Sequence, residues 1–106
     1  MGIDETLVAE ITRRILAVMV PERVILFGSA ATGRMTPDSD IDILVVVSNP
    51  QRPRDESVRI RRQLRGLGYP FDIVVISTER FEESKGVVGG IAYPANRYGR
   101  TIFAPA

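Results

Sequence analysis

The chain has 106 residues, enough for one small domain with a single hydrophobic core but not for a separate substrate domain of ordinary size. Charged residues make up 25% and hydrophobic residues 44%, a composition typical of globular proteins. The absence of cysteine and histidine excludes thiolate zinc sites, imidazole metal ligands, cysteine nucleophiles and Ser-His-Asp chemistry. A general base would therefore be a carboxylate, a lysine or a tyrosine.

The N-terminus has neither the basic start nor the continuous apolar run of a signal peptide. No segment approaches the roughly 20 apolar residues of a membrane-spanning helix. We therefore expect residues 1–106 to form a single soluble, cytoplasmic domain without a membrane partner.

The first half of the chain predicts a helix and two strands. Apolar residues recur at helical spacing over residues 4 to 19, and Pro21 ends that helix. The run "RVILFGS" is typical of a buried central strand closed by Gly28. After the loop "TGRMTPDS", the run "DIDILVVV" predicts a second strand.

The second half continues the same alternation. Residues 53 to 67 have a helical pattern with Gly66 and Gly68 at its end, and "FDIVVIS" predicts a third buried strand. A short helix should begin near Ser77 or Thr78. The tail predicts a helical turn entered at Pro94, a left-handed stop at Gly99 and a short edge strand.

Positive charge is concentrated in the segment from Gln51 to Gly68. It holds six arginines against two acids, a net +4, so the rest of the chain carries −3 of the total +1. Arginines 54, 61 and 65 share one helix face, and a solvated face is the simpler interpretation, with partner or RNA binding as the alternative. Because no aromatic residues interleave the arginines, base stacking is not indicated and we expect no nucleic-acid partner.

Three carboxylates begin the predicted strands. Asp40 and Asp42 are two residues apart, so their side chains should emerge on the same face, and Asp72 opens the third strand in the same way. If the two strands are neighbours, the carboxylates converge, and two unit charges 4 Å apart repel by about 4 kcal/mol at an effective dielectric of 20. All-oxygen ligands favour Mg²⁺ or Mn²⁺, and a pair of ions is the usual device for phosphoryl or nucleotidyl transfer.

Gly28 and Ser29 stand where the first strand stops and a short helix can start at Ala30 and Ala31. Free amides there favour an anion, with Gly28 letting a phosphate approach the backbone and Ser29 offering a hydroxyl. The stretch "GSAATGRM" also has the glycine spacing of a P-loop, but Arg34 and Met35 replace the lysine and the serine or threonine that this loop needs.

Gly28-Ser29, ten intervening residues, Asp40-x-Asp42 and a later strand-borne Asp72 resemble the signature of the DNA polymerase beta nucleotidyltransferase superfamily. The likeness is greatest to its small prokaryotic branch, the minimal nucleotidyltransferases (MNT, or MntA-like antitoxins), and extends over nearly the whole chain. The resemblance implies an α+β fold of the polymerase beta palm type, a small mixed β-sheet with helices packed on it.

The resemblance also implies a reaction, in which an acceptor hydroxyl attacks the α-phosphate of a nucleoside triphosphate and releases pyrophosphate. By position, Gly28 and Ser29 would hold the triphosphate, Asp40 and Asp42 would bind two Mg²⁺ ions (Mn²⁺ being an alternative), and Asp72 would bind the catalytic ion and serve as candidate base. The nucleotide donor would be ATP. The acceptor would be a tyrosine of a separate HEPN-domain toxin, which makes this chain an adenylylating antitoxin.

The sequence departs from the family at Ala30 and Thr32, where members often carry arginine. Loss of charge beside a triphosphate weakens binding unless Arg34 or a partner compensates. Two alternatives stay open: a catalytically weak binding module that neutralises a HEPN partner by contact, and a nucleotidyltransferase that modifies a small molecule such as an antibiotic. The small-molecule enzyme would need an acceptor site that this chain lacks, unless a homo-oligomer builds it.

Overall fold

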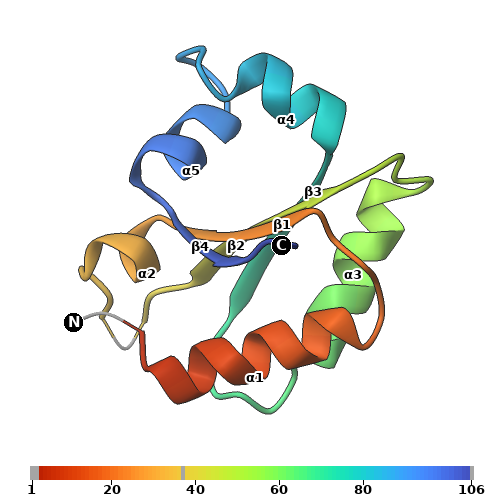
Figure 1. Cartoon of the computed structure of the whole chain (residues 1–106). Helices are drawn as coiled ribbons and strands as arrows, with labels where there is room; N and C mark the ends of the chain where they lie inside the picture. The colour runs from red at the N-terminus through yellow and green to blue at the C-terminus, as the bar shows by residue number, and fades with distance from the viewer. Residues whose placement is uncertain (1–2, 37, 106) are drawn as a thin grey trace.

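The computed structural model describes residues 3–36 and 38–105, and they form a three-layer arrangement around one mixed β-sheet (Figure 1). The sheet has four strands in the order β3-β2-β1-β4. Helices α1 and α3 cover one face, while α4 and α5 cover the other (Figure 1). The α+β fold with a small mixed sheet predicted from the sequence is therefore confirmed.

Strand register places the functional end of the molecule. β1 (Arg23–Phe27) pairs antiparallel with β2 (Ile41–Val47) and with β4 (Arg100–Phe103). β3 (Phe71–Ser77) pairs parallel with β2, in register from its first residue to its last. The end of β1 and the beginnings of β2 and β3 consequently meet at one end of the sheet.

The core is divided by the sheet into two apolar clusters. Alternate residues of β2 enter different clusters, because successive side chains of a strand point to opposite faces. Ile41, Ile43 and Val45 pack with α1 and α3, whereas Leu44 and Val46 pack with Phe81 of α4 and Ala92 and Ala95 of α5. β2 is thus buried on both sides, as its continuous apolar sequence predicts.

Helix α1 (Glu5–Leu16) begins after Asp4, whose carboxylate accepts a hydrogen bond from the backbone N–H of Thr6 at 2.7 Å. It buries Val8, Ile11 and Ile15, three positions on one helical stripe. The helix ends at Leu16, shorter than the predicted span of 4 to 19. After its last turn, the N–H groups of Val18 and Met19 both donate to the Ile15 carbonyl, at 3.1 and 3.2 Å, before the chain enters β1.

Helix α3 (Pro53–Gln63) has proline in its first turn, where a missing N–H costs nothing. It ends four residues before the predicted position 67, and Gly66 and Gly68 lie in the following loop with positive φ values of 86° and 89°. Helix α4 (Thr78–Ser84) starts after Ser77, whose hydroxyl accepts a hydrogen bond from the Arg80 N–H at 3.1 Å. This start agrees with the sequence prediction.

Two predictions for the C-terminal segment are wrong in detail. Helix α5 (Ala92–Tyr98) begins before Pro94, which is its third residue. Gly99 is extended, with φ −79° and ψ 170°, and is therefore not a left-handed stop. Glycine is needed there for space, since a Cβ would overlap the carbonyl oxygen of Ala95 and lie 2.6 Å from Ile25 Cγ2.

The prediction of a third buried strand is only half right. β3 is an edge strand of the described sheet, and its burial alternates, with Phe71, Ile73 and Val75 buried and Asp72 exposed. The other edge is β4, as predicted. Among the described residues, no helix has the length and apolar character that crossing a membrane requires.

Candidate functional site

The Gly-Ser turn and the aspartates predicted from the sequence lie at one end of the sheet, on three adjacent strands. Phe27, the last residue of β1, is the register partner of Asp42, and Asp42 is the register partner of Asp72. Asp42 and Asp72 are each the second residue of their strands. Their side chains point to the face of the sheet that α4 and α5 cover. On that face each strand continues with apolar residues, so each carboxylate stands at the polar end of an apolar row.

Asp42 occupies an unfavourable electrostatic position. It is half-buried, and burial together with the charges of Asp72 and Asp40 raises the pKa of the Asp42 carboxyl above its ordinary value of 3.8. Asp40 precedes β2 by one residue and is exposed, as is Asp72. Asp42 is thus the least exposed of the three aspartates, and the charges of the other two act on it.

Gly28 lies against the same carboxylate. A Cβ at this position would overlap Oδ2 of Asp42, and the glycine has φ 67° and ψ −146°, a conformation that residues with a side chain rarely adopt. Glycine is thus required here for both space and backbone conformation. The chain turns sharply from β1 into α2 (Ser29–Thr32) with its backbone directly beside Asp42.

The short helix α2 is the one predicted from the small residues after Gly28. The Gly28 carbonyl accepts hydrogen bonds from the N–H groups of Ala31 and Thr32, at 3.1 and 3.2 Å. The Ser29 side chain is half-buried on the first turn. Arg34 follows the helix, with its backbone N–H bonded to the Ser29 carbonyl at 3.1 Å and its side chain exposed.

The two positions that depart from the family pattern differ in environment. Ala30 is only 4% exposed and belongs to the cluster beneath α1, so an arginine there would bury its guanidinium. Thr32 is exposed at the end of α2, and its hydroxyl donates to the Gly28 carbonyl at 3.3 Å. Only position 32 could accept a larger charged side chain without disturbing the core.

The donor chemistry of this end fits a divalent cation. Carboxylate oxygens are the ligands that Mg²⁺ and Mn²⁺ prefer. A cation would offset both the burial of the Asp42 charge and its repulsion by Asp72 and Asp40, which together raise the pKa of Asp42. Within residues 3–36 and 38–105, no three acidic side chains already enclose a point as a ligand set. The fit to a cation therefore rests on the mutual effect of the aspartate charges and on the register of β2 and β3. Asp40, Asp42 and Asp72 are the residues that would hold the ion.

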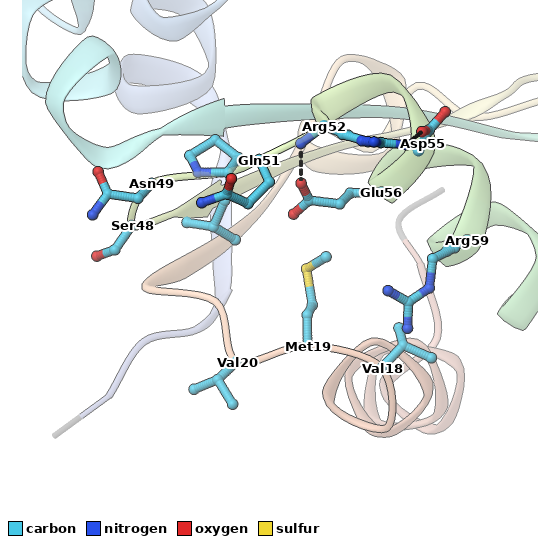
Figure 2. Close-up of a pocket in the computed structure, with 12 residues that line it drawn as sticks. Val18, Met19, Val20, Ser48, Asn49, Gln51, Arg52, Asp55, Glu56 and Arg59 are labelled. Carbon is cyan, nitrogen blue, oxygen red and sulfur yellow. Dashed lines mark hydrogen bonds and ion pairs between the residues drawn. The ribbon is translucent and has the colours of Figure 1, made fainter.

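A pocket of about 400 Å³, which the sequence does not predict, lies at the opposite end of β2 (Figure 2). Val18, Met19 and Val20 line one side, and Figure 2 shows Met19 beneath the start of α3. The other side includes Val47 at the end of β2, with Arg52 and Glu56 joined by a hydrogen bond of 2.9 Å from the Arg52 N–H. Periodicity could not reveal it, because its lining comes from two loops and a helix end.

Comparison with known proteins identifies a family. The family model of the nucleotidyltransferase domain matches residues 7–93. No curated protein sequence matches the chain.

Solved structures of similar fold include a toxin-antitoxin bound to AMP-PNP, with TM-score 0.73 and 17% identity over 92% of this chain and 73% of that one. A tri-AMPylated Shewanella oneidensis HEPN toxin in complex with its MNT antitoxin gives TM-score 0.61 and 15% identity, over 95% and 72% of the two chains. A putative nucleotidyltransferase from Sulfolobus solfataricus gives TM-score 0.56 and 28% identity, over 74% and 70%.

Proposed function

Because this chain belongs to the nucleotidyltransferase domain family, we propose that it transfers AMP from ATP to the hydroxyl group of an acceptor. In this reaction the acceptor oxygen forms a bond to the α-phosphorus, the bond to the bridging oxygen breaks, and pyrophosphate leaves. The acceptor hydroxyl loses its proton. The observation that carries the proposal is the direct pairing of Asp42 with Asp72, with Gly28 and Ser29 on the adjoining strand end.

Each residue at this end has a distinct task. Gly28 lets the triphosphate approach the backbone, Ser29 supplies a hydroxyl donor, and exposed Arg34 offers a charge near the same turn. Asp40, Asp42 and Asp72 would hold two Mg²⁺ ions, which when bound neutralise the phosphate charges. Asp72 is exposed at the edge strand, where an acceptor can approach, and is the candidate base for its proton.

The acceptor we propose is a tyrosine of a HEPN-type toxin, which makes the chain an antitoxin. Support comes from one of the similar structures, in which an MNT antitoxin accompanies a HEPN toxin that carries AMP groups. The physical argument is that Asp72 is exposed on an edge strand of the described sheet, where a second protein can approach it. A partner protein would supply both the hydroxyl and the surface that positions it.

The test uses the purified chain, the HEPN-type protein encoded beside its gene, α-labelled ATP and Mg²⁺, followed by intact mass. A gain of AMP on the partner, absent for Asp40→Ala, is the expected result. Asp38→Asn serves as the matched control, because Asp38 is an exposed aspartate outside the proposed site. Transfer at the wild-type rate by Asp40→Ala or Asp42→Asn would overturn the site assignment.

A second candidate is a binding module that neutralises the partner by contact alone. The observation that favours it is α2, where Ala30 is buried and residues Ser29 to Thr32 carry no charge for a triphosphate. A stable complex without transfer in the same experiment would support this module. Transfer to a small molecule, with no complex, would instead point to a small-molecule enzyme.

A further inference from the structure

Helix α3 presents a group of arginines that the nucleotide site does not use. Arg61, Arg62 and Arg65 are all exposed, and with Val58 they line a hollow of about 320 Å³. We refer to these four residues as the arginine face. Val58, Arg61 and Arg62 lie on α3, and Arg65 lies in the turn that follows it, where its N–H donates to the Arg62 carbonyl at 3.3 Å. Their three- and four-residue spacing puts the four on one side of this segment.

Among the residues that the structure describes, no carboxylate forms an ion pair with the arginine face. The two acids of α3 lie near its other end, where Asp55 forms an ion pair with Arg52 at 3.8 Å and Glu56 accepts from the Arg52 N–H. In the part of the chain that the structure describes, the ion pairs of arginine involve only residues 13, 14, 52 and 100. Like charges at this spacing repel each other and destabilise the helix. The favourable interaction of positive charge with the C-terminal end of the helix dipole offsets this cost only in part.

Arg61 and Arg65 lie on the side of α3 away from α1, and Arg62 lies on the solvent side between them and Arg59. Arg59 lines the pocket beside Val18 and Met19, which follow α1, as Figure 2 shows. A step of two residues turns an α-helix by about 200°, so Arg61 points to the opposite side. Since α3 packs mainly on β3, the edge strand, that side is the open edge of the sheet.

The arginine face is also near the end of the sheet that carries Asp72. Helix α3 starts after β2 ends and runs back, and a short loop joins its last turn to the beginning of β3. Arg14 of α1 holds this turn, because its guanidinium donates to the carbonyls of Gln63 and Arg65 at 3.0 and 2.9 Å. The arginines therefore stand on a fixed helix end in the layer of α1 and α3, whereas the Asp72 side chain points to the other face of the sheet. An acceptor docked on the arginines reaches Asp72 by passing around the edge strand β3.

We propose that the arginine face docks an acidic segment of the protein acceptor and so brings the acceptor hydroxyl to Asp72. This inference rests on the proposed transfer to a protein. Guanidinium groups bind carboxylates through paired hydrogen bonds, and a carboxylate-rich segment would relieve the repulsion within the helix. The face contains no aromatic residue on which a base could stack, which favours acidic protein over nucleic acid.

The test measures binding without nucleotide, by fluorescence anisotropy at low salt. The probes are a labelled glutamate-rich peptide with one tyrosine, a serine-rich peptide with the same tyrosine, and a labelled RNA oligonucleotide. The variant Arg61→Gln/Arg62→Gln/Arg65→Gln removes the charge but keeps good helix formers, and circular dichroism checks its fold. The control is Arg80→Gln, an exposed arginine of α4 on the other face of the sheet.

The proposal expects the acidic peptide to bind the wild-type chain, and the triple variant to bind about tenfold more weakly, because three exposed ion pairs are lost. Arg80→Gln should bind as the wild type does. Equal binding of the serine-rich peptide, or no loss in the triple variant, would overturn the proposal. Binding of RNA in preference to the acidic peptide would also overturn it and assign the face to nucleic acid.

Transfer assays separate this inference from the proposed function. With ATP, Mg²⁺ and the acidic peptide, the triple variant should raise KM for the peptide about tenfold while KM for ATP stays unchanged. If neither the wild type nor the triple variant transfers AMP, but binding of the acidic peptide still depends on the arginines, the docking surface stands and the enzymatic function fails. If AMP is transferred with equal KM by both chains, the function stands and the docking surface fails.

Discussion

Asp42 of β2 and Asp72 of β3 are direct register partners in a parallel pair of strands, 30 positions apart in sequence. Parallel pairing puts the two carboxylates on the same face of neighbouring strands. Burial of the Asp42 carboxylate, and after it the charge of Asp72, raise the pKa of Asp42. Without a cation, this arrangement disfavours the ionised form of the Asp42 carboxyl. A bound cation would favour that form, which is the behaviour expected of a metal site.

The pH dependence of stability should reveal this pairing. A carboxyl group whose pKa is raised on folding binds protons more tightly in the native state, so it lowers stability as pH rises above its ordinary value of 3.8. The chain with Asp42→Asn should match the wild type below that pH. It should have the higher melting temperature at neutral pH, once the folded-state pKa has been passed.

Thermal unfolding followed by circular dichroism from acid to neutral pH checks this expectation. Adding Mg²⁺ at neutral pH should raise the melting temperature of the wild type and leave that of Asp42→Asn unchanged. A melting temperature of Asp42→Asn that stays below the wild type at neutral pH would show that the carboxylate stabilises the native state.

Gly28→Ala should damage both stability and transfer. The new Cβ would overlap Asp42 Oδ2, and the positive φ of 67° adds backbone strain, so we expect a loss of about 2 kcal/mol or more in unfolding free energy. Gly66→Ala is the matched control, since Gly66 also has a positive φ but no atom near its Cβ position. It should cost only about 1 kcal/mol. Urea unfolding compares the two variants. Equal losses of unfolding free energy would mean that the overlap with Asp42 does not contribute to the cost of Gly28→Ala.

Ser29→Ala should weaken use of the triphosphate. A hydroxyl that donates to a charged phosphate contributes about 1.5–3 kcal/mol, so kcat/KM for ATP should fall by about tenfold or more. Steady-state kinetics at varied ATP measure this effect, and Ser39→Ala, in the loop before β2, is the control. No change in either kinetic constant would place Ser29 outside the phosphate site.

Thr32→Arg should improve nucleotide binding. Position 32 is exposed at the end of α2, so a guanidinium there adds charge beside the proposed phosphate site without entering the core. We expect KM for ATP to fall by up to about fivefold, the effect of one exposed ion pair. Thr32→Gln adds length without charge and should leave KM unchanged. An increase in KM for Thr32→Arg would mean that the phosphates bind elsewhere.

Gly99→Ala should destabilise the fold without any change of backbone conformation. A Cβ would overlap the Ala95 carbonyl and approach Ile25 Cγ2 and the Leu26 carbonyl at 2.6 and 2.8 Å. Such overpacking costs about 1–3 kcal/mol, measurable by urea unfolding. Gly90→Ala, where nothing lies near the Cβ position, should be close to neutral. Similar stability of the two variants would show that α5 shifts easily away from β1.

The amino-acid sequence predicted most of the elements correctly because they depend on local pattern. Continuous apolar runs defined β1 and β2, and helical spacing defined α1 and α3, although the helix ends were placed several residues too late. Helix ends depend on hydrogen bonds from distant groups, such as Arg14 on the carbonyls beyond α3, which periodicity does not contain. The same limit applies to Gly99, whose role is set by Ile25 and Ala95 across the fold.

The Gly28-Ser29 turn and the aspartates were recognisable in the sequence because residue type and spacing alone carry that signal. Only the tertiary structure decided that β3 lies beside β2 in parallel register, which couples Asp72 to Asp42. It also made β3 an edge strand and packed α3, which carries Arg61 and Arg62, mainly against it. Strand order and register are set by packing across the whole sheet and not by any one segment, so the local sequence determines which residues are available and the fold determines which of them meet.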